Sequence, residues 1–251
     1  MEKNERIWII GGSSGIGLEL VKILLDDGFK LVVSSRTATK NEHLEKLQIN
    51  FKNSLYLIDL DVNDEHFKDK IAEAFGVYDG LDIWFYNAAV YEVMGIDNWD
   101  KEKFIQLNNT NYLGVVKLMT DILPFFEKQK YGRWIWNLSL SSYFGLPKGG
   151  AYSAPKAALL NLAQSIQPEL KNINIDLQVV NHGFVQTRLT AKNDFEMPQL
   201  MSPEFTALNI YKKIKNSNSF ETSFPFKLSA FLRLLSILPY KISLAITRKM
   251  I

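Results

Sequence analysis

Tyr152 and Lys156 are the residues of this chain best suited to proton-transfer chemistry. They stand four residues apart in the run 151–159, and this spacing places two side chains on one face of a helix. An ammonium beside a phenol favours the phenolate, so we expect Lys156 to lower the pKa of Tyr152. A tyrosine tuned in this way can exchange a proton near neutral pH, which an ordinary tyrosine cannot.

An upstream serine extends this pair. Ser139 lies thirteen residues before Tyr152 and follows a predicted strand, so its hydroxyl should reach the same cleft. Ser141 and Ser142 are alternatives, and the spacing favours Ser139. A Tyr-x-x-x-Lys pattern also occurs by chance on solvated helix faces, so it indicates a catalytic site only together with a second motif elsewhere in the chain.

That second motif is a glycine-rich turn near the N-terminus. The chain reads Gly11-Gly-Ser-Ser-Gly-Ile-Gly17 between the first predicted strand and the first predicted helix. Glycine permits a tight turn and a close backbone approach to a pyrophosphate at the positive end of the helix. Ser13 and Ser14 can add hydroxyl donors. The alternative is a structural turn without a ligand.

The elements that position these residues alternate between strands and helices. Short apolar runs predict strands at 7–10, 30–35, 55–60, 81–86, 133–138, 175–181 and 220–223. Helical spacing predicts helices at 18–25, 41–51, 67–75, 107–126, 152–170 and 203–214. Pro124 is expected to interrupt the helix at 107–126. This alternation predicts an α/β fold with a doubly wound, parallel, Rossmann-like sheet.

Composition and net charge exclude several classes of protein and of binding site. The chain has 251 residues, of which 47% are hydrophobic and 22% charged, which indicates one globular unit rather than a disordered chain. A net charge of +2 argues against a general nucleic-acid binder. The chain has no cysteine, so disulfides and thiolate zinc sites are excluded, and no metal site is predicted. Without a signal-peptide pattern or an apolar run of about 18 residues, a cytoplasmic location is expected.

Taken together, these residues resemble the motifs of the short-chain dehydrogenases/reductases. The resemblance covers about residues 6–223 and rests on the glycine turn, Asp61-Val62, Asn87-Ala88, Asn111, Ser139, Tyr152 with Lys156, and Gly183 with Thr187. It implies an NAD(P)-dependent oxidoreductase that interconverts an alcohol and a carbonyl by hydride transfer. The alternative is a non-catalytic dinucleotide-binding regulator or scaffold, although such relatives usually lack the tyrosine or the lysine.

The resemblance implies roles for four catalytic residues. Tyr152 would be the general acid/base, and Ser139 would hydrogen-bond the reacting oxygen of the substrate. Lys156 would also bond the nicotinamide ribose. Asn111 would hold a water that completes a proton relay, and an Asn-x-x-Gly match distinguishes it from the neighbouring Asn108 and Asn109.

The resemblance also implies a set of cofactor contacts. Asp61 would contact the adenine, with helix capping as the alternative role. His182 stands where the family usually has proline, and we interpret it as a structural residue. The full set comprises Gly11, Ser13, Ser14, Gly15, Ile16, Gly17, Arg36, Asp61, Val62, Asn87, Ala88, Tyr152, Lys156, Val185 and Thr187.

The end of the second predicted strand indicates which dinucleotide is bound. Ser35 occupies the position where an acidic residue would select NAD, and Arg36 follows it. A guanidinium can form paired hydrogen bonds with a 2′-phosphate. We therefore expect NADP(H), with NAD(H) as the less favoured choice. The alternative is a solvated loop arginine.

The C-terminal residues differ in charge from the rest of the chain. Residues 226–251 carry five basic and no acidic residues, so residues 1–225 contribute −3 to the net charge of +2. We expect 1–225 to form one Rossmann-like NAD(P)-binding catalytic domain and 226–251 a helical tail of the same unit. The tail could contact an anionic membrane surface. We favour packing over the cleft or against a second subunit, which suggests a lipophilic substrate and a homodimer or homotetramer.

Overall fold

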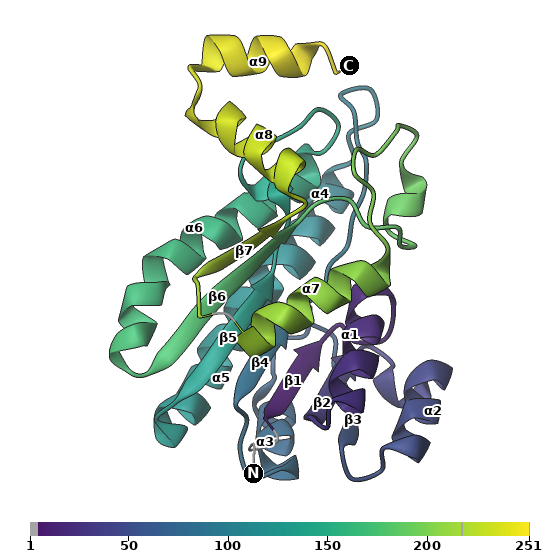
Figure 1. The fold of residues 1–251 in the computed structure, drawn as a ribbon, viewed down its shortest axis with the longest axis vertical. Coiled ribbons are helices and arrows are strands. Elements are labelled where there is room, and N and C mark those ends of the chain that lie inside the picture. The colour runs from purple at the N-terminus through teal and green to yellow at the C-terminus, as the bar shows by residue number, and fades with distance from the viewer. Residues whose placement is uncertain (1–4, 217, 251) are drawn as a thin grey trace.

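The computed structural model describes residues 5–216 and 218–250. Within them, seven parallel strands form one sheet in the order β3-β2-β1-β4-β5-β6-β7 (Figure 1). The strand order reverses direction between β1 and β4. Doubly wound sheets bind ligands in the crevice at such a switch point. The predicted fold class is therefore confirmed. The strands are β1 (Arg6–Ile10), β2 (Lys30–Ser35), β3 (Leu55–Asp59), β4 (Ile83–Tyr86), β5 (Gly132–Asn137), β6 (Ile175–His182) and β7 (Glu221–Phe224).

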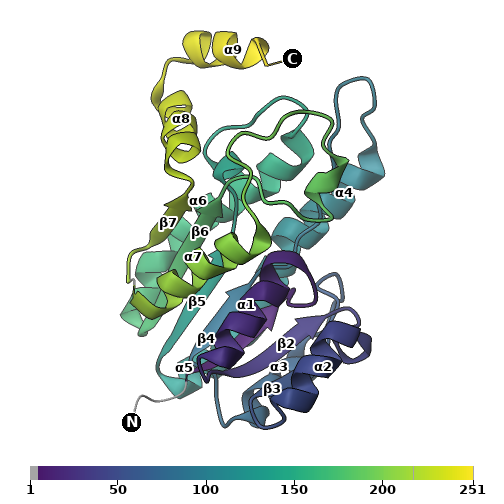
Figure 2. The same cartoon turned by 45° about the vertical axis from the view of Figure 1, so that its right-hand side comes forward.

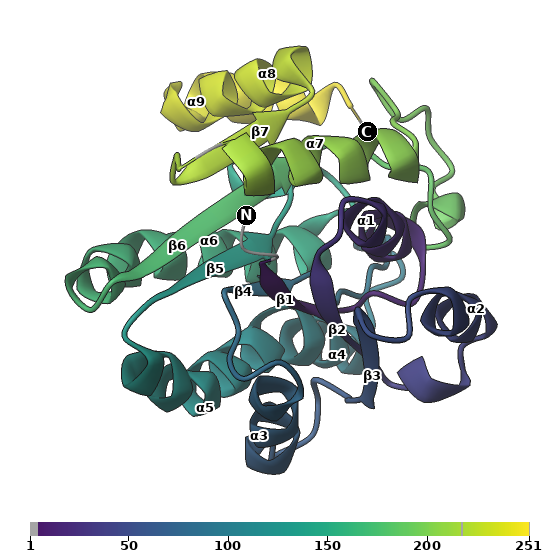
Figure 3. The same ribbon diagram turned by 60° about the horizontal axis from the view of Figure 1, so that its bottom comes forward.

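Helices cover both faces of the sheet (Figure 3). Helices α1, α2 and α7 pack on one face, and α3, α5 and α6 pack on the other. The helices are α1 (Gly15–Asp26), α2 (Glu42–Asn50), α3 (Lys68–Val77), α4 (Lys101–Asn108), α5 (Gly114–Gln129), α6 (Gly150–Asn172), α7 (Pro203–Asn216), α8 (Phe226–Ile237) and α9 (Tyr240–Arg248).

The core follows from the two-residue period of the strands. In β1, Ile7 and Ile9 face the cluster of α1 and α7, while Trp8 faces the cluster of α5 and α6. Strands buried on both faces carry continuous apolar runs, as β4 and residues 7–10 of β1 do. On the second face, Trp84 and Trp134 pack at right angles with ring centroids 5.1 Å apart. The two residues are direct neighbours across β4 and β5, so this contact joins the two strands on that face.

The helix predicted at 107–126 differs from expectation in two ways. Pro124 does not interrupt it, since α5 continues to Gln129. The missing N–H removes one hydrogen bond, but Ile122 and Phe126 are buried on either side and keep the helix packed. The helical stretch changes character earlier instead, at a π-helical segment, Asn109–Leu113, between α4 and α5. Such segments occur often at functional sites.

The tail forms two helices beyond the sheet, with Pro239 between them (Figures 1 and 2). Helix α8 buries Leu228, Leu232 and Leu235 against Leu140 of the same chain. Helix α9 lies farther from the sheet. None of the helices in the described part of the chain is long and apolar enough to cross a membrane.

Candidate active site

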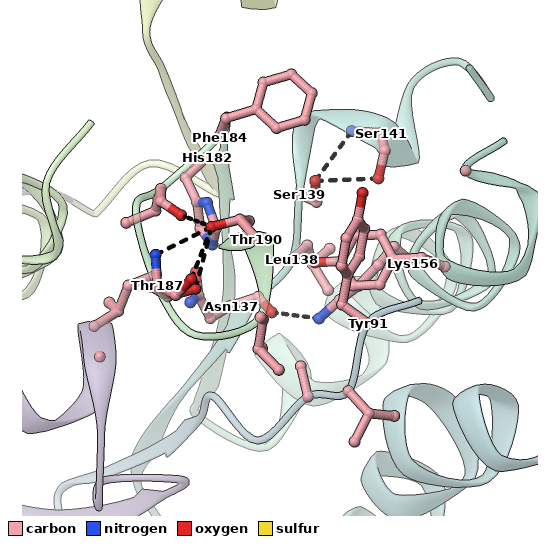
Figure 4. Close-up of a pocket in the computed structure, with 18 of the residues that line it drawn as sticks. Tyr91, Asn137, Leu138, Ser139, Ser141, Lys156, His182, Phe184, Thr187 and Thr190 are labelled. Atoms are coloured by element: carbon pink, nitrogen blue, oxygen red, sulfur yellow. Dashed lines mark hydrogen bonds between the residues drawn. The ribbon is translucent and has the colours of Figure 1, made fainter. Parts of the chain in front are cut away.

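A cavity of about 950 Å³ lies at the carboxyl ends of the strands. Its walls come from the β1–α1 turn, the segments after β4, β5 and β6, the first turns of α6, and α8. Figure 4 shows side chains from several of these elements directed into it. Parallel strands bring segments that are far apart in sequence to one edge of the sheet, so this placement follows from the topology.

The glycine turn forms one end of the cavity, which five of its six predicted contacts line: Gly11, Ser13, Ser14, Gly15 and Ile16. Gly11 has a φ of +89°, and a Cβ there would lie 2.6 Å from the backbone nitrogen of Ala88. Gly17 has a different role, since it does not line the cavity. A Cβ on Gly17 would lie 2.1 Å from the Gly11 carbonyl oxygen, so this glycine lets the helix approach the turn.

Asn87 connects three strand ends beside this turn. Its Nδ2 donates to the Gly11 carbonyl at 2.7 Å, and its Oδ1 accepts from Asn137 Nδ2 at 2.8 Å. Asn87 and the following Ala88 line the cavity, as predicted for cofactor contacts. The asparagine thus fixes the turn relative to β4 and β5, which is a structural task in addition to the proposed binding one.

The far wall of the same cavity contains Ser35, Arg36, Asp61 and Val62. The hydroxyl oxygen of Ser35 is buried and has no hydrogen-bond partner among the described residues, whereas Arg36 is exposed. Asp61 Oδ1 accepts from the backbone and side-chain nitrogens of Asn63 at 3.0 and 2.9 Å. Because α3 begins only at residue 68, the alternative that Asp61 caps this helix is wrong.

Three of the four predicted catalytic residues line the cavity together: Ser139, Tyr152 and Lys156. Figure 4 shows Ser139 and Lys156 on this wall. Lys156 is buried, and its Nζ donates to the Asn137 carbonyl at 2.9 Å and lies 5.7 Å from the centroid of the Tyr152 ring. Ser139 Oγ accepts from the backbone and hydroxyl of Ser141 at 3.2 and 3.1 Å.

The electrostatics of this cluster differ from the prediction. Burial raises the pKa of Tyr152, and a hydrogen bond with Ser139 only partly opposes this effect. Burial also lowers the pKa of Lys156 to about 8. The expected lowering of the Tyr152 pKa by Lys156 is therefore wrong for this structure. The physical reason is that the ammonium is directed to the Asn137 carbonyl, while loss of hydration disfavours the phenolate.

Asn111 is brought to the neighbourhood but not to the cavity wall. It is buried within the π-helical segment, where its Oδ1 accepts from the Val90 N–H at 2.9 Å and its Nδ2 donates to the Val90 carbonyl at 2.8 Å. This pair of bonds ties the helix to the segment that follows β4. The side-chain amide is thus engaged by backbone, and the relay water stays a prediction.

The segment after β6 supplies Val185 and Thr187 to the cavity wall. Thr187 N donates to Thr190 Oγ1 at 3.0 Å, which fixes the start of the segment 190–202. His182 also lines the cavity, with Nδ1 2.8 Å from the Gly183 carbonyl. Burial lowers the pKa of His182 to about 4, so the ring is neutral at neutral pH. The Nδ1 nitrogen then carries the proton, since the carbonyl can only accept.

Tyr91 is a site residue that the sequence analysis missed. Its ring packs at right angles to that of Tyr152 with centroids 5.0 Å apart, and its hydroxyl donates to Asn193 Oδ1 at 2.9 Å. Lys192 next to Asn193 pairs with Glu92. The position of Tyr91, four residues after Asn87 in the segment that follows β4, was the feature that could have indicated it.

Apart from Lys148, Arg188 and Glu196, which also line the cavity, its remaining wall is largely apolar. It is formed by side chains from the segments after β5 and β6, from α8 and from the end of the chain. These are Leu146, Phe184, Phe195, Leu228, Phe231, Leu232 and Met250. The tail therefore contributes directly to the cavity, and this end suits an apolar group rather than a charged one.

Comparison with known proteins agrees with this architecture. The family model described as short chain dehydrogenase matches residues 5–197. An uncharacterized oxidoreductase of Staphylococcus haemolyticus is 30% identical over 205 residues, which is 81% of this chain and 88% of the relative. The 3-oxoacyl-[acyl-carrier-protein] reductase MabA of Mycobacterium bovis is 26% identical over 194 residues, covering 77% and 74%.

Solved structures share the fold. A short chain dehydrogenase from Burkholderia cenocepacia, described in complex with NADP, superposes with a TM-score of 0.81 at 18% identity and 97% coverage of both chains. A short-chain dehydrogenase from Streptomyces avermitilis superposes with a TM-score of 0.83, also at 18% identity, covering 99% of this chain and 98% of the other. With the family model matching most of the chain, the protein belongs to the short-chain dehydrogenase family of oxidoreductase enzymes.

Proposed function

We propose that this protein is an NADP(H)-dependent oxidoreductase that interconverts an alcohol and a carbonyl on a lipophilic substrate. The observation that carries the proposal is one cavity in which Ser139, Tyr152 and Lys156 share walls with the glycine turn and Arg36. The apolar wall from α8 and the segment 190–202 supports the lipophilic substrate. The names of several relatives, oxidoreductase and 3-oxoacyl reductase, support the reaction class.

The residues around the cavity fit a dinucleotide. The turn at Gly11 excludes side chains and presents backbone at the start of α1, which suits a pyrophosphate. The buried Ser35 hydroxyl, unpartnered among the described residues, and the exposed Arg36 suit a 2′-phosphate. Two structural neighbours are described with NADP bound, which agrees with the choice of NADP(H) as the cofactor.

The chain's own residues would handle the substrate oxygen. A bound nicotinamide would supply or accept the hydride. Ser139 would donate its hydroxyl to the oxygen, and Tyr152 would exchange a proton with it. Since burial raises the pKa of Tyr152, the phenol is protonated at neutral pH and ready to donate. The Asn137 carbonyl holds the Lys156 ammonium beside that ring.

The test of this proposal is NADPH oxidation with a panel of aliphatic ketones and aldehydes of increasing chain length. We expect turnover that improves with apolar chain length. Tyr152→Phe should still bind NADPH, since only a hydroxyl is removed, but should lose roughly 100-fold or more of the turnover. If wild-type protein binds NADPH and no carbonyl or alcohol reacts, the alternative of a non-catalytic dinucleotide-binding regulator gains support.

Cofactor choice gives a separate prediction. Arg36→Ala should weaken NADPH binding about tenfold or more and leave NADH binding nearly unchanged, because only NADPH has the 2′-phosphate. Dissociation constants from tryptophan fluorescence quenching would measure both. Lys52→Ala, at an exposed position outside the cavity wall, is the matched control. Equal wild-type affinities for NADPH and NADH would contradict this part of the proposal.

A further inference from the structure

The outer surface of the tail is unusually apolar for an exposed surface. Of the seventeen large apolar side chains exposed in the described part of the chain, seven lie within residues 226–250. On α8, Phe226, Leu234 and Ile237 are 82%, 50% and 79% exposed. With the exposed Ala230 they follow helical spacing along one face, opposite the face that packs against the cavity.

Helix α9 continues this surface. Tyr240 and Leu244 are 76% and 57% exposed, whereas Ser243 and Thr247 are buried and, of the described α9 residues, Ile246 alone packs against the leucine cluster of α8. A helix that turns small polar groups inward and leaves apolar ones exposed has an unpartnered apolar surface. Something other than the body of this chain is needed to cover it.

The charge of the tail indicates what covers it. Lys227, Lys241, Arg248 and Lys249 are exposed, and none pairs with an acidic side chain among the described residues. Arg233 alone pairs, with Glu221. A two-fold contact with a second copy would set this surface against itself. It would bring two sets of unpaired cations together without any tail acid to compensate, which is unfavourable in a partly desolvated interface.

We propose that the outer surface of α8 and α9 docks on an anionic lipid bilayer. The apolar side chains enter the headgroup region, and the four unpaired cations contact lipid phosphates and carboxylates. The opposite side of α8 lines the cavity through Leu228, Phe231 and Leu232. Docking therefore sets the cavity beside the lipid, while Met250 at the end of the tail lies on the cavity wall.

Co-sedimentation of the full-length protein with vesicles tests the proposal. We expect binding to phosphatidylcholine vesicles that contain phosphatidylserine, weaker binding as salt increases, and little binding to pure phosphatidylcholine. The triple variant Lys241→Glu, Arg248→Glu, Lys249→Glu should lose about tenfold or more of this affinity. The matched control Lys46→Glu, Lys52→Glu, Lys68→Glu makes the same change in charge at exposed positions outside the tail and should bind as wild type.

A second pair of variants tests the apolar contribution. Phe226→Ser with Ile237→Ser should weaken vesicle binding about tenfold without lowering the melting temperature, since both side chains are exposed. Phe205→Ser with Ile49→Ser, at exposed sites elsewhere, is the control. Two results would overturn the proposal: no vesicle binding by the wild type, or a change of mass in light scattering for Phe226→Ser with Ile237→Ser. The second result would assign this surface to a contact between copies of the chain.

Discussion

Tyr91 connects the tyrosine of the reacting cluster to the segment 190–202. Tyr91→Phe keeps the ring that packs on Tyr152 and removes the hydrogen bond to Asn193. A hydrogen bond of this kind contributes about 1 kcal/mol, so we expect KM for the substrate to rise about fivefold with a smaller change in kcat. Steady-state kinetics would measure the two constants, with Tyr131→Phe as a control tyrosine outside the cavity. An unchanged KM would show that the bond does not matter in the complex.

His182 gives a pH-dependent prediction at the same scale. An unfolded histidine has a pKa of about 6.5, and burial lowers that of His182 to about 4. Between these values the unfolded chain binds a proton that the folded chain does not, so this group reduces stability as pH falls from 6.5 to 4. His182→Gln should flatten that part of the stability curve in urea unfolding. His43→Gln, at an exposed histidine, should not, and identical slopes would contradict the assignment.

At the scale of elements, α8 acts as part of the cavity wall and of the core. Deleting 226–251 would remove Leu228, Leu232 and Leu235 and expose Leu140, against which they pack, together with the neighbouring Phe184. Burial of a leucine contributes about 1.5–3 kcal/mol, so the deletion should lower the free energy of unfolding by several kcal/mol and promote aggregation. Melting temperature and light scattering would measure both effects.

A shorter deletion separates the two helices of the tail. Removing 239–251 takes away α9, whose fully buried residues are the small Ser243 and Thr247 and whose one apolar contact with the α8 cluster, within the described part of the chain, is the partly buried Ile246. We expect this variant to stay folded with a nearly unchanged melting temperature. The longer deletion, of 226–251, is the contrasting case. If that variant also stayed soluble and equally stable, α8 would add nothing to the fold.

At the scale of the whole molecule, the assembly stays a prediction. We expect a homodimer or homotetramer, since Ile96, Trp99 and Ile105 leave exposed apolar surface around α4, outside the tail. Light scattering should give twice or four times the chain mass of 28.8 kDa. Trp99→Ser should shift the mass toward the monomer, whereas a monomeric wild type would contradict the expectation.

The sequence by itself determined the alternation of strands and helices, the parallel sheet and the positions of the three cavity-lining catalytic residues, but it predicted no separate helix for α4. The correct predictions follow from local information. Apolar periodicity indicates each element, and the four-residue spacing of Tyr152 and Lys156 sets one helix face. The glycine turn likewise specifies its own backbone, as the φ of Gly11 shows. Pro124 shows the limit of such local rules, because packing of its buried neighbours kept the helix intact.

The tertiary structure alone decided how the site residues are engaged. The hydroxyl of Tyr91 meets Asn193, 102 residues away, and the side chain of Asn111 is bonded to Val90 rather than directed into the cavity. Loss of hydration reversed the expected pKa of Tyr152, an effect that spacing along a helix cannot reveal. Which face of α8 is buried was decided in the same way. Each of these outcomes depends on contacts between segments that are distant in sequence, which only the folded chain brings together.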